Sequence, residues 1–304
     1  MPTAIAVTSA DQVLPGGQVR VVAPPQTQSL QDALGETSAV LEQHGFLIVV
    51  YAAGAPAPVV RRLHTVRSVL ESDRIVLLPI DLPPLAVAVL ARQLAHLAAA
   101  FSPGVVASAA RLLTHYLYAG AVLGSVSRLD RVPGTPFAQL AAHVKSWLPG
   151  GQFAVLAGPK PELVKVAEGV TLPGPTFATG LYVAQGHLVS EWIERTLVPS
   201  WQVEGVAAVP LPADSAGWWA TGKVIEFAAG ITDPSVLQHV VASVRRDQCP
   251  WCRLEIIGDR CVRCQTALPP PAPPAQTAPP PQTPTAPTAT AAGHLKPVPP
   301  GGRG

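Results

Sequence analysis

Two uninterrupted apolar runs, each preceded by an amphipathic pattern, constrain the fold of this 304-residue chain more than any other feature. The runs Phe46–Tyr51 and Arg74–Ile80 have the length of strands and lack the polar positions of a strand with a solvated face. A helical pattern precedes the first run, with Ser29 as its N-cap and Gly45 as its stop, and a second one occupies residues 59–70. This alternation predicts an α/β fold, with a parallel or mixed sheet flanked by helices.

Two longer apolar segments, residues 82–101 and 105–123, follow the second run. Each is about as long as a bilayer requires, so membrane spans are the alternative to buried helices. Arg92 and Arg111 lie near the middles of the segments, where an ionised side chain is costly in lipid. We therefore expect an apolar helical hairpin within residues 83–124 and no membrane span.

A division of the chain into parts follows from these patterns and from a change in composition near the C-terminus. Beyond residue 268, Pro, Ala and Thr dominate and offer little to bury, which predicts a disordered tail with polyproline character. The second part can be continuous with the first, because no sharp linker separates them. The expected parts are an α/β domain with the hairpin (1–130), a second α/β or α+β part (131–246), a cysteine module (247–266) and the tail (267–304).

The charge content of the chain is low. Charged residues make up 13% of the sequence and the formal net charge is +2, against a typical charged share of about 25%. Low surface charge favours burial in a homo-oligomer or a complex, although a biased genome composition explains it equally well. The net charge is too small to hold a polyanion over the whole surface. The N-terminus lacks the pattern of a secretory signal, so we expect a cytoplasmic protein of bacterial type.

The cysteines carry the most specific pattern in the sequence. They form two CxxC pairs with eight residues between them, a spacing that lets a hairpin bring four thiolates to one point: Cys249, Cys252, Cys261 and Cys264. This segment, residues 248–265, resembles the zinc-ribbon family, although Arg253 and Gln265 stand where ribbons often carry glycine. The resemblance implies one structural zinc ion with no open position for catalysis. A pair of disulfides or a redox role, and bound iron, are the alternatives.

Four residues around the cysteines are candidate partner contacts: Trp251, Arg253, Arg260 and Arg263. Arginine forks beside an aromatic face suit an acidic partner or nucleic acid. The local excess of positive charge is small, so we expect contact with a protein before contact with nucleic acid.

The body before the cysteines contains no recognisable catalytic constellation, and we lean against an enzyme. Its best candidates are Gly54 and Asp81, which follow the two buried strands at the edge where α/β proteins commonly hold ligands. The sequence therefore predicts a non-enzymatic binding or assembly protein, a scaffold or adaptor with a structural zinc ribbon and a flexible proline-rich arm. Its alternatives are an enzyme with a site near Gly54 and Asp81, and a nucleic-acid-associated factor that uses the ribbon arginines.

Overall fold

The computed structural model describes residues 2–126, 129, 151–269 and 301–302. The chain divides into two units, residues 1–268 and 269–304, and the description below concerns the first. The predicted boundary between the first two parts, at residues 130–131, lies outside the described residues. So does nearly all of the predicted tail.

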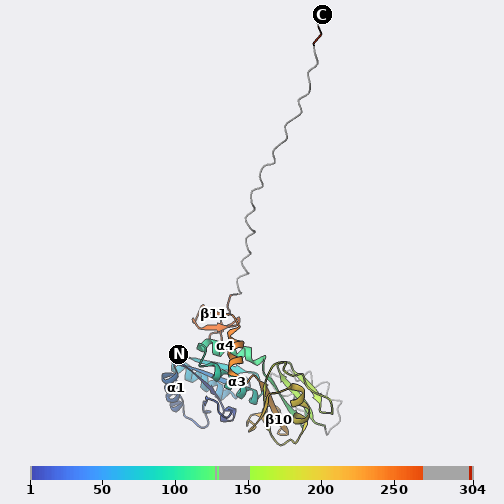
Figure 1. The fold of residues 1–304 in the computed structure, drawn as a ribbon. Helices are drawn as coiled ribbons and strands as arrows, with labels where there is room; N and C mark the ends of the chain where they lie inside the picture. The colour runs from blue at the N-terminus through green and yellow to red at the C-terminus, as the bar shows by residue number, and fades with distance from the viewer. Residues whose placement is uncertain (1, 127–128, 130–150, 270–300, 303–304) are drawn as a thin grey trace. The chain divides into compact units, whose positions relative to one another are not determined.

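The N-terminal part of the chain forms a four-stranded parallel sheet (Figure 1). Its order is β2-β1-β3-β4, with β1 at Thr3–Val7, β2 at Val19–Val21, β3 at Phe46–Ala52 and β4 at Ile75–Ile80. Ile5 lies opposite Ile48, and Ile48 opposite Val76. Alternate side chains point to opposite faces, and both faces are covered, which explains why these strands are apolar throughout. The predicted α/β fold with a parallel sheet is confirmed.

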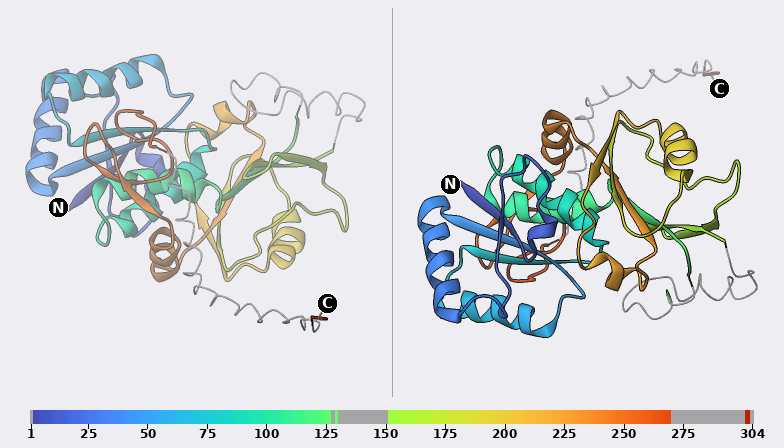
Figure 2. Two further views of the ribbon diagram at one scale, coloured as in Figure 1. Left: turned by 90° about the horizontal axis from the view of Figure 1, so that it is seen from above. Right: turned by 90° about the horizontal axis from the view of Figure 1, so that it is seen from below.

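Helices cover the two faces of this sheet, as Figure 2 shows. Helices α1 and α2 pack on the face that carries Ala6, Leu47 and Val49. Helices α3 and α4 pack on the opposite face, with Ile5 and Ile48. The helices span Leu30–His44 (α1), Ala57–Val69 (α2), Pro84–Leu97 (α3) and Pro103–Thr114 (α4).

The ends of α1 follow the sequence signals closely. The Ser29 hydroxyl accepts a hydrogen bond from the backbone N–H of Asp32, which satisfies one of the free donors of the first turn. Gly45 ends the helix in the left-handed conformation, with φ at 71°, and its N–H donates to the carbonyl of Leu41. Both predicted ends of this helix are confirmed.

The second sheet has six strands in the order β7-β6-β5-β10-β8-β9. Its neighbouring strands pair antiparallel, except β8 and β9, which run parallel, as far as the structure describes this sheet. Helix α3 lies between the two sheets and packs on β1 and on β10. The strands span Tyr118–Leu123 (β5), Phe153–Gly158 (β6), Glu162–Lys165 (β7), Gly180–Gln185 (β8), Gly205–Val209 (β9) and Val224–Gly230 (β10).

The second helix of the predicted hairpin is shorter than expected. It ends at Thr114, and residues 118–123 form strand β5 instead. This strand is nearly central in the six-stranded sheet and is buried from Ala119 to Leu123. Burial on both faces gives a strand the same unbroken apolar run as a buried helix, so periodicity does not distinguish them.

Of the helices that the structure describes, none combines the length and apolar character needed to cross a bilayer.

The remaining elements are short. A two-stranded antiparallel pair, β11 with β12, follows α8 and belongs to the cysteine module. These elements are 3-10 helix η1 (Ala10–Gln12), π-helix η3 (Ile193–Leu197), α6 (Val198–Trp201), α7 (Ser215–Trp218), α8 (Pro234–Ala242), β11 (Arg246–Gln248) and β12 (Glu255–Ile257).

Candidate functional site

An apolar cavity of about 250 Å³ lies between the parallel sheet and helices α1 and α2. Small side chains leave this space open, notably Ala6 on β1 and Ala33 on α1, where larger residues would fill it. Its apolar lining consists of Ala6, Leu47, Val49, Ile75 and Leu77 from the sheet, Ala33, Ala39 and Val40 from α1, Leu63 and Val66 from α2, and Val21 and Val22.

Polar side chains line the cavity toward both ends of α1, and the acidic Glu36 of that helix lines it as well. The half-buried Arg62 of α2 donates a hydrogen bond to the backbone carbonyl of Gln28 at 3.2 Å. The exposed Arg20 of β2 lies 2.8 Å from Gln43 Oε1 and 2.8 Å from His44 Nε2. Among the described residues, neither guanidinium forms an ion pair with a carboxylate. The partners of Arg62 and Arg20 lie at opposite ends of α1, which rises about 21 Å over its length. Each positive charge is therefore available to an anionic group at its own end of the cavity.

Sequence reasoning missed this cavity. The strand and helix patterns assign Leu47, Leu63 and Val66 to a core, which is where the structure places them. Whether a core contains free space depends on how side-chain volumes add up across three elements. The sequence shows the small residues Ala6 and Ala33 and the basic Arg20 and Arg62, but no local pattern places them around one space.

The four cysteines come together in the cysteine module, predicted at residues 247–266, which in the structure begins with β11 at Arg246 and is taken below as residues 246–268. Their sulfur atoms all lie within 4.8 Å of one another. Across the two knuckles, Cys249 Sγ lies 3.6 Å from Cys264 Sγ, and Cys252 Sγ lies 3.5 Å from Cys261 Sγ. These separations exceed the roughly 2.05 Å of a disulfide. They match the spacing of about 3.8 Å between sulfurs that each lie about 2.3 Å from one tetrahedral ion. The cluster can therefore hold a metal ion.

The residues proposed as partner contacts lie on the surface of the cysteine module. Trp251 has 79% of its surface exposed. Arg253 is exposed, Arg263 is half-buried, and the exposed Arg260 donates a hydrogen bond to the carbonyl of Gln265 at 2.8 Å. Their role as partner contacts stays a prediction.

Gly54 and Asp81, the two candidates for an enzyme site, lie at one edge of the parallel sheet. The backbone N–H of Ala53 donates to the carbonyl of Ile80 at 2.9 Å, which places the loop with Gly54 beside Asp81. Partial burial raises the pKa of Asp81 above its ordinary value. Neither residue lines the apolar cavity.

The sequence analysis did not single out Glu226, a buried carboxylate between the two sheets. Glu226 of β10 is fully buried, and its Oε1 accepts a hydrogen bond from the backbone N–H of Leu85 at 2.8 Å, in the first turn of α3. Burial raises the pKa of Glu226 to about 7, and hydrogen bonds from Ser215, Leu85 and Trp219 oppose this rise. Glu226 thus ties β10 to the N-terminus of α3.

Comparison with known proteins assigns the fold. No family model matches the chain, and neither does any curated protein. Among solved structures, a DegV family protein from Thermus thermophilus matches with a TM-score of 0.54 and 14% identity, over 76% of this chain and 99% of that one. A DegV family protein from Corynebacterium glutamicum matches at 0.53 and 11%, over 77% and 98%. A DegV lipid binding protein from Thermotoga maritima matches at 0.51 and 11%, over 77% and 99%. The body of this chain has the DegV fold.

This assignment corrects several sequence predictions. The zinc-ribbon resemblance covers only residues 248–265. The DegV fold of the body was not predicted from the sequence. The Thermus structure is described as one of fatty acid binding and the Thermotoga protein as lipid binding. These neighbours contradict the predicted scaffold or adaptor role and the nucleic-acid alternative. They give no support to a zinc or protein-interaction function, or to an enzyme site at Gly54 and Asp81.

Proposed function

We propose that this protein binds a fatty acid, or a similar single-chain carboxylate, in the apolar cavity between the parallel sheet, α1 and α2. The observation that carries the proposal is the combination of this cavity with the half-buried guanidinium of Arg62, which forms no ion pair among the described residues. An amphiphile with an acyl chain and one negative charge is complementary to both features. Fatty acid or lipid binding by two proteins of the same fold adds support.

The size of the cavity bears on chain length. Its 250 Å³ lies just below the range of about 300 to 1,000 Å³ that small-molecule sites usually have. A chain of medium length would be enclosed, whereas a longer one would leave its end in solvent. Each buried CH₂ group contributes about 0.8 kcal/mol, so two more enclosed carbons should raise the affinity roughly tenfold.

The test is a calorimetric titration of the delipidated protein with saturated fatty acids of increasing chain length. We expect the affinity to climb with each added pair of carbons and then level off once the cavity is full. The matching primary alcohols, which lack the charge, should bind more weakly at every length. If affinity does not depend on chain length, or if no fatty acid binds, the proposal is wrong.

We also propose that the cysteine module holds one structural zinc ion. Four cysteine thiolates form a donor set that zinc prefers, and the sulfur separations suit tetrahedral coordination. Cys249, Cys252, Cys261 and Cys264 would be the ligands, and the ion would supply cohesion rather than chemistry. Elemental analysis of protein purified under reducing conditions should find one zinc per chain, and the variant Cys261→Ser should lose it. Cytoplasmic location and a protein partner or second copy stay predictions.

A further inference from the structure

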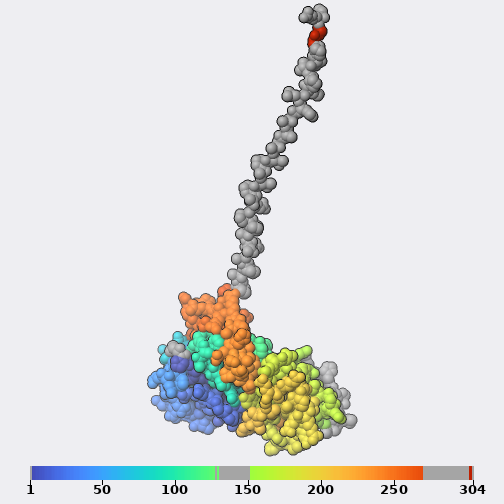
Figure 3. All heavy atoms as spheres, in the orientation of Figure 1, coloured from blue at the N-terminus to red at the C-terminus, as the bar shows by residue number. Residues whose placement is uncertain are grey.

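The cysteine module packs on the N-terminal end of α4. Successive side chains of β12 point to opposite sides: Ile256 points to the cysteines, while Glu255 and Ile257 point to the body. Ile257 and Val262 are 5% and 6% exposed and belong to the main core. Figure 3 shows the orange module lying against the green segment that contains α4.

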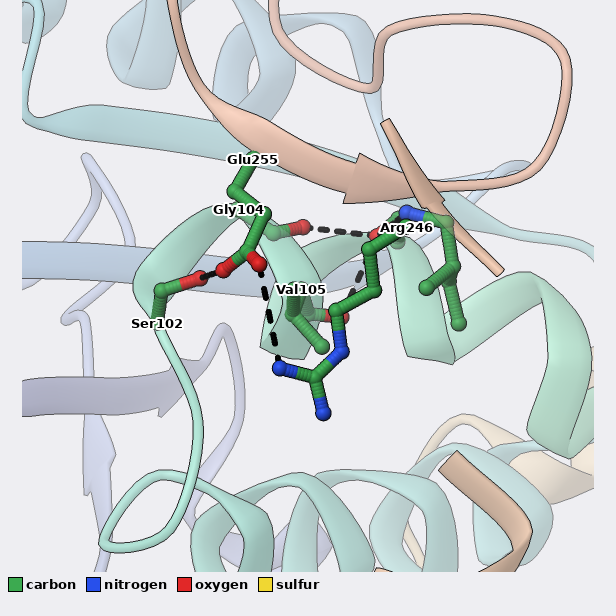
Figure 4. Close-up of polar contacts among 7 residues, drawn as sticks. Ser102, Gly104, Val105, Arg246 and Glu255 are labelled. Carbon is green, nitrogen blue, oxygen red and sulfur yellow. Dashed lines mark hydrogen bonds and ion pairs between the residues drawn. The ribbon is translucent and has the colours of Figure 1, made fainter. Parts of the chain in front are cut away.

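Polar contacts fix the register of this packing (Figure 4). The hydroxyl of Ser102, the N-cap residue of α4, donates to a carboxylate oxygen of Glu255 at 2.7 Å. The backbone N–H of Ile257 donates to the hydroxyl of Ser108 at 3.0 Å, and that hydroxyl donates to the carbonyl of Gly104 at 2.7 Å. The Glu255 carboxylate also lies 3.7 Å from the guanidinium of Arg246. A carboxylate at a helix N-terminus is favoured by the helix dipole.

Gly104 makes this close approach possible. A Cβ atom at this position would collide with the backbone carbonyl oxygen of Glu255 and lie 3.1 Å from Leu254 Cβ. Gly104 lies in the first turn of α4, so alanine would suit the helix itself. Here glycine is required by the neighbour rather than by the conformation of its own backbone.

The same contacts hold the wall of a second, larger cavity of about 1040 Å³. Phe101 and Ser102 line it, together with residues from β1, β2 and the end of α3. The guanidinium of Arg246 lies over the Phe101 ring, 5.1 Å from its centroid, and Glu255 holds Ser102. The cysteine module therefore positions two residues of that wall.

The module has little to hold it together without a metal. Its two strands are three residues each, and its own fully buried cluster consists of Cys249, Ile256 and Cys261. A two-stranded pair of this size is not stable alone, and metal binding supplies the folding free energy of such modules.

We propose that metal occupancy of the cysteine module controls its docking on α4, and thereby the order of residues 98–109 and the shape of the second cavity. This inference rests on the proposed metal site. Loss of the ion, by chelation or by scarcity, would release β12, withdraw Ile257 and Val262 from the core and free Phe101 and Ser102. The body would thus respond to metal at the second cavity, which shares Arg20 with the fatty acid cavity.

Hydrogen exchange with mass spectrometry of the full chain, before and after chelation under reducing conditions, tests this. Exchange should rise about tenfold or more in residues 246–268 and also in residues 98–109, as in a local opening. Residues 30–44, which form α1, serve as the internal reference and should not change. Faster exchange confined to 246–268 would overturn the proposal. Elemental analysis of the same sample separates this result from absence of metal, which would overturn both proposals.

The variant Gly104→Val gives a second, independent reading, since it blocks docking without touching a ligand. We expect it to keep one metal per chain while residues 98–109 exchange rapidly with or without the ion. Ser108→Ala, a milder change that removes the acceptor of the Ile257 N–H, should show the same trend to a smaller degree. If both variants retain full protection of 98–109, and lose it on chelation as the wild type does, the contacts described above do not transmit the effect and the proposal is refuted.

Discussion

Replacement of Glu226 by glutamine should remove a pH-dependent loss of stability. The side chain is fully buried on β10, and its ionised form is disfavoured there because water is excluded. Its pKa rises from 4.5 in a solvated chain to about 7 in the folded protein. At about 1.4 kcal/mol per pH unit, this rise corresponds to roughly 3 kcal/mol.

The direction follows from proton binding. The folded protein binds this proton more tightly than the unfolded chain does, so the stabilisation is fully present below pH 4.5. It is lost as the pH rises toward about 7, and above that value both states are ionised and the loss is complete. Glu226→Gln stays neutral and can still accept the hydrogen bond from Leu85 N–H, so it should be spared this loss.

Urea denaturation between pH 4.5 and 8 measures the effect as the difference in unfolding free energy between Glu226→Gln and wild type. This difference should shift in favour of the variant by about 3 kcal/mol over that range. The control is Glu191→Gln, which removes an exposed ion pair with Arg195 at 2.8 Å and should change stability by less than about 1 kcal/mol. A difference that stays constant with pH for Glu226→Gln would refute the reasoning.

Two further predictions use matched pairs of variants. Arg62→Gln should weaken fatty acid binding about tenfold or more in calorimetry, because it removes a charge-assisted contact. Arg61 is its exposed neighbour outside the cavity lining, so Arg61→Gln should leave the affinity unchanged. Equal effects of the two variants would disprove a role for Arg62. Gly45→Ala should destabilise the protein by about 1 kcal/mol or more in urea denaturation, because φ is 71° there. Gly35→Ala, in the middle of α1 with open space around it, should stabilise by up to about 1 kcal/mol, and the reverse order would contradict this account of the helix end.

The first half of the fold could be predicted because local signals agree with the tertiary structure there. Ser29, Gly45 and the run Phe46–Tyr51 each mark an end or a strand without reference to distant residues. Strand β5 could not be separated from a helix, since its neighbours β6 and β10 come from far along the chain. The DegV fold itself was hidden because the matching structures share only 11% to 14% of their residues with this chain.

The candidate sites differ in the same way. The cysteines could be found because the ligands lie within sixteen residues of one another and their spacing alone defines the cluster. The cavity and Glu226 depend on packing between elements that the sequence does not connect. Glu226 sits in an apolar strand pattern, where a single carboxylate gives no sign that it will meet the N-terminus of α3.

A larger side chain inside the apolar cavity should compete with a bound acyl chain for the same space. Ala33→Leu places a larger side chain in the cavity from a position on α1 that is 4% exposed, and Gly35→Ala on the same helix is the control. In calorimetric titration with dodecanoate, we expect Ala33→Leu to stay folded and to lose most or all binding, whereas Gly35→Ala should bind as the wild type does. Undiminished binding of dodecanoate to folded Ala33→Leu would contradict fatty acid binding in this cavity.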